Sequence, residues 1–71
     1  MMLNLRAVRR QKDITQDELA KKSGVSRATI SYLESGVATD AAVSTLTKLA
    51  SALGISVREL FLPNESSVLD N

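Results

Sequence analysis

Apolar residues recur along the chain at intervals of three and four positions, the spacing that places side chains on one face of an α-helix. One such segment runs from about Leu3 to Lys12, and a longer one begins near Ala42 and ends at Gly54. No segment shows the alternation of a half-buried strand, so the pattern predicts an all-α fold. The apolar positions are Leu5 and Val8 in the first segment and Val43, Leu46, Leu49, Ala50 and Leu53 in the second.

Two capping boxes mark further helix starts. In a capping box, the side chains of the first and fourth residues bond to backbone N–H groups that have no partner within the helix. The T-Q-D-E run from Thr15 to Glu18 fits this motif and predicts a second helix from about Gln16 to Lys22. The S-V-R-E run from Ser56 to Glu59 is the other box, and it predicts a short fifth helix with Leu60 and Phe61 on its apolar side.

A third helix starts shortly after the second one ends. Gly24 closes the second helix, because a residue without a Cβ readily adopts the left-handed conformation of a helix terminus. Ser26 is a favourable N-cap for a helix from Arg27 to about Ser35, which Gly36 closes in the same way. Residues 16–35 are therefore predicted to form two helices joined by a tight turn.

The predicted third helix has two unlike sides. Ile30 and Leu33 fall on one side and are expected to be buried. The opposite side carries one arginine, small residues and hydroxyls, with Tyr32 at its edge. Short side chains permit close approach to the major groove of DNA, where an arginine can donate twice to guanine. The residues of this opposite side are Arg27, Ala28, Ser31 and Ser35.

Charge and composition narrow the possible functions. The net charge is only +1, but residues 1–36 carry seven basic and four acidic side chains, whereas residues 37–71 carry two and four. The basic half therefore coincides with the two-helix motif, as expected of a surface that faces DNA. The 71-residue chain has no cysteine or histidine and no glycine-rich phosphate loop, so we expect no metal site, no cofactor and no enzyme activity.

The chain length predicts a single domain, residues 1–71, near the lower limit for a stable core, so a partner subunit is expected. No segment has the length of a membrane span, and the N-terminus has no signal-peptide pattern, which predicts a cytoplasmic protein. The tail, residues 63–71, is polar and acidic and is expected to be flexible. An arm that contacts a second subunit is the alternative for this tail.

The chain as a whole resembles the Cro and phage-repressor type of helix-turn-helix protein, the Xre family. The resemblance covers about residues 5–61 and implies a lambda-repressor-like DNA-binding domain of five short helices, with the helix-turn-helix at 16–35. The residues that carry it are Thr15-Gln16, Glu18-Leu19-Ala20, Gly24-Val25-Ser26, Ile30, Leu33-Glu34 and Gly36, followed by Thr45-Leu46, Lys48-Leu49-Ala50, Ala52-Leu53-Gly54-Ile55 and Glu59-Leu60.

The resemblance implies specific roles on the third helix. Arg27, Ala28 and Tyr32 match the positions that read bases in the family, and Ser31 lies beside them. Alternatives stay open for two of them: Arg27 as a phosphate contact or a solvated side chain, and Tyr32 as a ring that covers the core. Ala28 offers only a methyl group, which either packs on a thymine methyl or leaves room for the groove.

Gln16 matches the family position that contacts a DNA phosphate, and Arg9 and Glu34 match a structural ion pair between the first and third helices. After Gly36 the family commonly has a basic residue and then a proline, both of which this chain lacks. Ser35 and Thr39 are the remaining candidates for phosphate contacts there. We therefore expect each monomer to bind DNA with modest affinity.

The family's usual activity implies a homodimeric repressor on a near-palindromic operator in double-stranded DNA, with a protein antagonist as a possible further partner. Leu60, Phe61 and Leu62 are the candidate dimer surface, and core packing of Leu60 and Phe61 is the competing interpretation. The alternative function is a protein-interaction module of the same fold, such as an antitoxin-like protein or a co-regulator. DNA binding predicts a steep salt dependence, which protein interaction does not.

Overall fold

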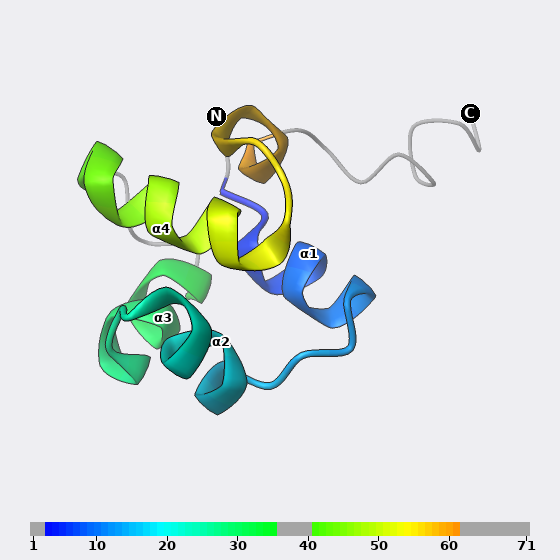
Figure 1. Ribbon diagram of the computed structural model, residues 1–71, viewed down its shortest axis with the longest axis vertical. Coiled ribbons are helices and arrows are strands. Elements are labelled where there is room, and N and C mark those ends of the chain that lie inside the picture. The colour runs from blue at the N-terminus through cyan, green and yellow to red at the C-terminus, as the bar shows by residue number, and fades with distance from the viewer. Residues whose placement is uncertain (1–2, 36–40, 62–71) are drawn as a thin grey trace.

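Four α-helices and one 3-10 turn make up the fold in the computed structural model, which describes residues 3–35 and 41–61 (Figure 1). The predictions for the tail, Leu62, Gly36 and Thr39 lie outside these residues. None of the helices in the described ranges is long and apolar enough to cross a membrane. The elements are α1 (Leu5–Gln11), α2 (Gln16–Ser23), α3 (Arg27–Glu34), α4 (Val43–Leu53) and the 3-10 turn η1 (Val57–Leu60).

The helix-turn-helix starts and stops where local chemistry predicts. At α2, the Glu18 backbone N–H donates to the Thr15 hydroxyl over 3.1 Å, and the Thr15 N–H donates to the Glu18 carboxylate over 2.9 Å. Gly24 ends α2 with a φ of 77°, in the left-handed region that disfavours side chains with a Cβ. Ser26 caps α3 by accepting a hydrogen bond from the Thr29 N–H at 3.1 Å. These contacts confirm the capping box, the turn glycine and the serine cap.

The predicted short fifth helix is present and is of the 3-10 type, η1. Its backbone bonds join residues three apart: the Glu59 N–H donates to the Ser56 carbonyl at 3.1 Å, and the Phe61 N–H to the Arg58 carbonyl at 3.0 Å. A four-residue segment is too short to establish the i→i−4 bonds of an α-helix, and 3-10 turns serve in such short pieces. The Ser56–Glu59 box is present, with the Ser56 N–H donating to the Glu59 carboxylate at 3.1 Å.

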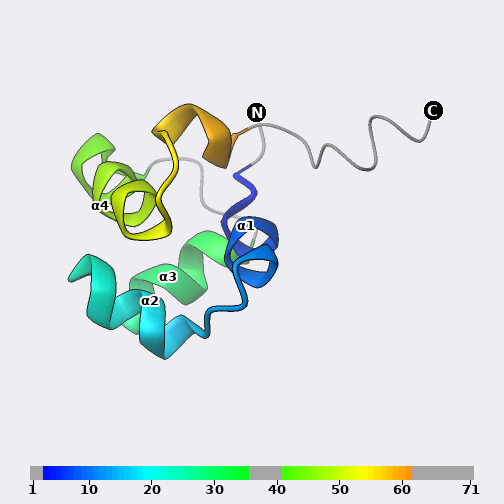
Figure 2. The same ribbon diagram turned by 45° about the vertical axis from the view of Figure 1, so that its right-hand side comes forward.

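A single apolar core lies among these elements. Helix α2 packs against both α3 and α4, while α1 contacts α3 and α4 contacts η1. In Figure 2 α4 lies above α2 and α3, with α1 to their side. The core therefore covers the side of α3 that carries Ile30 and Leu33 and leaves the other side exposed. The buried core residues are Leu5, Leu19, Val25, Ile30, Leu33, Leu46, Leu49, Ala50, Leu53 and Leu60.

Leu60 belongs to the monomer core and not to a dimer surface. Its side chain has no exposed area, and its carbonyl accepts a hydrogen bond from the Asn4 N–H at 2.6 Å. Phe61 is partly buried and packs against the same core. The competing interpretation, core packing, therefore holds for Leu60, because η1 turns its apolar side toward α4.

Candidate nucleic-acid interface

The outer side of α3 presents the four side chains that the sequence analysis assigned to base reading. Ile30 and Leu33 anchor the inner side with exposed fractions of 0% and 2%. Because these two residues fix the inner side of the eight-residue helix in the core, the opposite side faces outward and is available to a partner. Tyr32 is 52% exposed and is not part of the buried core. The four exposed side chains are Arg27, Ala28, Ser31 and Tyr32.

An ion pair connects the beginnings of α2 and α3. The Arg27 guanidinium lies 3.2 Å from the Asp17 carboxylate, and the two side chains are 64% and 67% exposed. Exposed pairs of this kind contribute only about 0–1 kcal/mol, so this pair leaves Arg27 able to turn toward a ligand. The sequence does not predict the pairing with Asp17, because two residues ten positions apart on different helices give no pairing signal.

The expected ion pair between Arg9 and Glu34 is present and joins α1 to α3. The two side chains are only 13% and 5% exposed, and two guanidinium nitrogens donate to the Glu34 carboxylate at 2.6 and 3.1 Å. Arg9 also donates to the Ile14 carbonyl at 2.7 Å. A fork–fork geometry in a buried setting fixes the position of α3 relative to α1.

The pKa values of this pair reflect the contacts. Hydrogen bonding to Glu34 raises the pKa of Arg9 above its usual value. Burial by itself would raise the pKa of Glu34, but hydrogen bonds from Arg9 and Gln16 and the charges of Arg9 and Arg6 outweigh burial, so the net shift of this pKa is downward. Glu34 is therefore ionised at neutral pH, with its charge matched by Arg9.

Gln16 is drawn into the same network. Its side-chain Nε2 donates to the Glu34 carboxylate at 3.0 Å, a contact that the sequence analysis did not predict. A primary amide carries two N–H donors, so one remains for a further acceptor. The bond to Glu34 thus holds Gln16, the candidate phosphate ligand, beside the C-terminal end of α3.

Three residues with predicted DNA contacts meet at one polar hollow of about 360 Å³ between α1, α2 and α3. Gln16, Ser31 and Ser35 line it, although the sequence places them on two helices and a helix end. The Ser35 hydroxyl also donates to the Tyr32 carbonyl at 2.6 Å. Within residues 3–35 and 41–61, no group of acidic, histidine or cysteine side chains is arranged to hold a metal ion. The remaining lining residues are Arg6, Arg9 and Glu34.

Comparison with known proteins agrees with this geometry. The chain is 41% identical over 64 residues to the uncharacterized HTH-type transcriptional regulator y4dJ of Sinorhizobium fredii, an alignment that covers 90% of this chain and 82% of the relative. Among solved structures, the restriction-modification controller protein C.AhdI of Aeromonas hydrophila is 38% identical. Its TM-score is 0.75, with 82% of this chain and 86% of that chain covered.

The biofilm regulator SinR of Bacillus subtilis, solved in complex with DNA, is 29% identical with a TM-score of 0.75, covering 82% of this chain and 92% of that one. SinR has also been solved in a complex with the protein SinI, with a TM-score of 0.74 to this chain. The profile of the helix-turn-helix family HTH_3 matches residues 5–60. The chain therefore belongs to the Xre/Cro-type helix-turn-helix family of DNA-binding transcriptional regulators.

Proposed function

We propose that residues 5–61 act as one domain that binds double-stranded DNA sequence-specifically, as a homodimeric repressor that inserts α3 into the major groove. The single observation that carries this proposal is the exposed outer side of α3. It holds one arginine, a methyl group, a hydroxyl and a tyrosine directly above the buried Ile30 and Leu33. The core thus supports a helix side whose short side chains allow close approach to base edges.

Arg27 is the principal base-reading residue in this proposal. It lies in the first turn of α3, the part of a recognition helix that reaches deepest into the groove, and its planar fork fits the two acceptors of guanine. Ala28, Ser31 and Tyr32 contact neighbouring bases or leave room for them. Gln16 and Ser35 bind backbone phosphates at the edge of the groove, and Thr39 is assigned the same role from the sequence alone.

Dimerisation supplies the affinity that one such monomer lacks. Two α3 helices about 34 Å apart would match successive major grooves on a near-palindromic operator. Phe61 and Leu62 remain the proposed contribution to the dimer contact, since Leu60 is enclosed within the monomer. The complex of SinR with SinI supports a protein antagonist as a further partner for this chain.

The test measures fluorescence anisotropy of the protein with an operator duplex selected from random-sequence DNA, for the wild type and Arg27→Ala. We expect Arg27→Ala to weaken operator binding by about 1–3 kcal/mol, or roughly 5- to 150-fold, and to relax discrimination at one base pair. Arg58→Ala is the matched control, because it removes the same charge from η1, at the opposite end of the molecule from α3 (Figure 1). Equal effects of the two variants, or binding that ignores salt, would favour the protein-interaction module instead.

A further inference from the structure

The polar hollow between α1, α2 and α3 has the composition of an anion site. Three donors from separate parts of the chain surround it: the Arg6 guanidinium, the Gln16 amide and the Ser31 hydroxyl. The Ser35 hydroxyl also lines the hollow, but it already donates its hydrogen to the Tyr32 carbonyl. The base of the hollow is the ion pair of Arg9 and Glu34. The hollow is open to solvent, and its volume of about 360 Å³ leaves room for a group of phosphate size.

The charge balance of the hollow is positive. Glu34 is the one carboxylate among the lining residues, and Arg9 satisfies it with two short hydrogen bonds. Arg6 adds a second positive charge near enough to Glu34 to help lower the pKa of that carboxyl group. One carboxylate against two guanidinium groups leaves a net charge of +1, which favours an anion.

The hollow opens beside the surface that reads DNA. Ser31 belongs both to the exposed side of α3 and to the lining of the hollow. An anion in the hollow would thus lie directly at the edge of the recognition helix. In a DNA complex the anion at such an edge is a backbone phosphate that flanks the contacted bases.

We propose that this hollow binds one phosphate of the DNA backbone and that Arg6 is its principal ligand, together with Gln16 and Ser31. The proposal rests on the proposed function and deepens it, because it adds α1 to the DNA-binding surface. The sequence alone does not assign Arg6 to a specific DNA contact, because Arg6 is one of several arginines on an amphipathic helix. The folded arrangement of three helices turns that arginine into part of a site.

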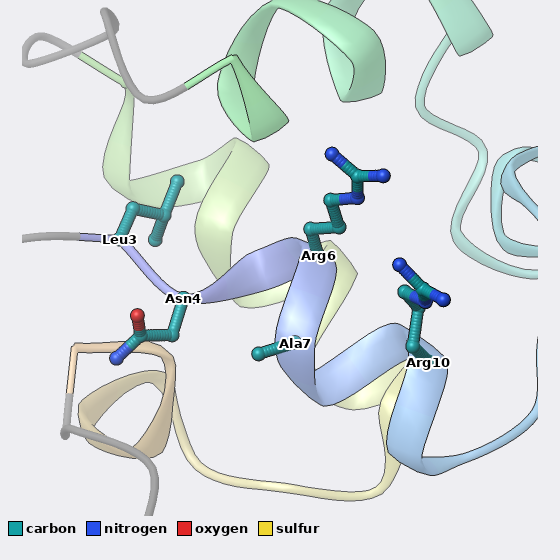
Figure 3. A pocket seen from close by; sticks show the side chains of 5 residues that line it. All are labelled: Leu3, Asn4, Arg6, Ala7 and Arg10. Carbon is teal, nitrogen blue, oxygen red and sulfur yellow. The ribbon is translucent and has the colours of Figure 1, made fainter.

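Arg10 provides a matched control on the same helix. Figure 3 shows Arg6 and Arg10 on α1, where they follow each other at the four-residue spacing of neighbours on a helix surface. Both line a second, more apolar pocket of about 310 Å³ with Leu3, Asn4 and Ala7. Of the two arginines, only Arg6 also lines the polar hollow. If α1 attracted DNA only through its overall charge, removing either arginine would weaken DNA binding equally.

The experiment measures binding of the full chain to a short DNA duplex of arbitrary sequence by anisotropy, between about 50 and 200 mM salt. We expect Arg6→Gln to weaken binding about tenfold and to reduce the slope of log K against log salt by about 0.9, the value for one phosphate. Because a phosphate carries no sequence information, a selected operator duplex should show the same losses. Arg6→Lys retains the charge, and we expect it to keep the slope. Arg10→Gln should leave it nearly unchanged.

Equal slopes for Arg6→Gln and Arg10→Gln would overturn the proposal, as would loss of the slope in Arg6→Lys. Thermal unfolding checks that each variant is folded. Because both arginines are exposed, we expect little change in Tm. If the wild type itself binds neither duplex, the proposed function fails. If the wild type binds DNA but Arg6→Gln binds equally well, only the phosphate site fails.

Discussion

The ion pair between Arg9 and Glu34 yields the most direct test of how this small fold is held together. Glu34→Gln keeps the size of the side chain but removes its charge and turns one acceptor into a donor. The carboxylate accepts hydrogen bonds at 2.6 and 3.1 Å from Arg9 and at 3.0 Å from Gln16. In the variant an amide group faces these donors, and Arg9 keeps a positive charge at 13% exposure without a counter-ion.

The expected cost follows from burial. Removing one partner of a buried pair costs about 3–5 kcal/mol, and the remaining carbonyl of glutamine argues for the lower end, about 3 kcal/mol. At about 0.05–0.15 kcal/mol per residue, a domain of this length has a free energy of unfolding of about 4–11 kcal/mol. The variant should therefore lose a large share of its stability, and its Tm should fall by about 12–24 °C.

Thermal and urea unfolding without DNA, followed by circular dichroism, provide the assay. The double variant Arg9→Met/Glu34→Met removes both charges, so we expect it to lose less than the sum of the two single methionine variants. A loss below about 1 kcal/mol for Glu34→Gln would refute the reasoning, because that is the range of exposed ion pairs.

The pH dependence of stability gives a second readout of the same residue. The pKa of Glu34 is lower in the folded protein than the value of 4.5 for a free side chain. The carboxylate therefore contributes stability that is fully present above that value and is lost as pH falls through the folded pKa. In Glu34→Gln this part of the acid sensitivity should be absent.

Two further predictions concern Leu60 and Asp17. Leu60→Ala should lower the free energy of unfolding by about 2–5 kcal/mol in urea titrations, because the side chain is fully buried. Ultracentrifugation should show the same oligomeric state for this variant as for the wild type. A lower oligomeric state with normal stability would instead place Leu60 in a subunit interface. Asp17→Asn should raise DNA affinity about two- to fivefold on any sequence, since it removes a negative charge 3.2 Å from Arg27. If only operator binding changed, and not binding to arbitrary DNA, Asp17 would instead position Arg27.

Local interactions were predictable from the sequence. The Thr15 capping box, the Ser26 cap and the glycine at position 24 each involve residues within a few positions of one another, so their motifs specify the helix ends directly. The spacing of Ile30 and Leu33 likewise identified the buried side of α3. Together with the family resemblance, these signals determined the helix-turn-helix and its outward side.

The contacts between distant residues were decided only by the tertiary structure. How α1 crosses α3 determines that Arg6, and not Arg10, lines the polar hollow, and how α2 meets α3 brings Asp17 to Arg27 and Gln16 to Glu34. The burial of Leu60 also depended on packing. Its position in the sequence pattern fits either a core or an interface, and the contact of η1 with α4 buries it. The physical reason is that helix crossings depend on the sum of many weak side-chain contacts along two surfaces, which no local motif encodes.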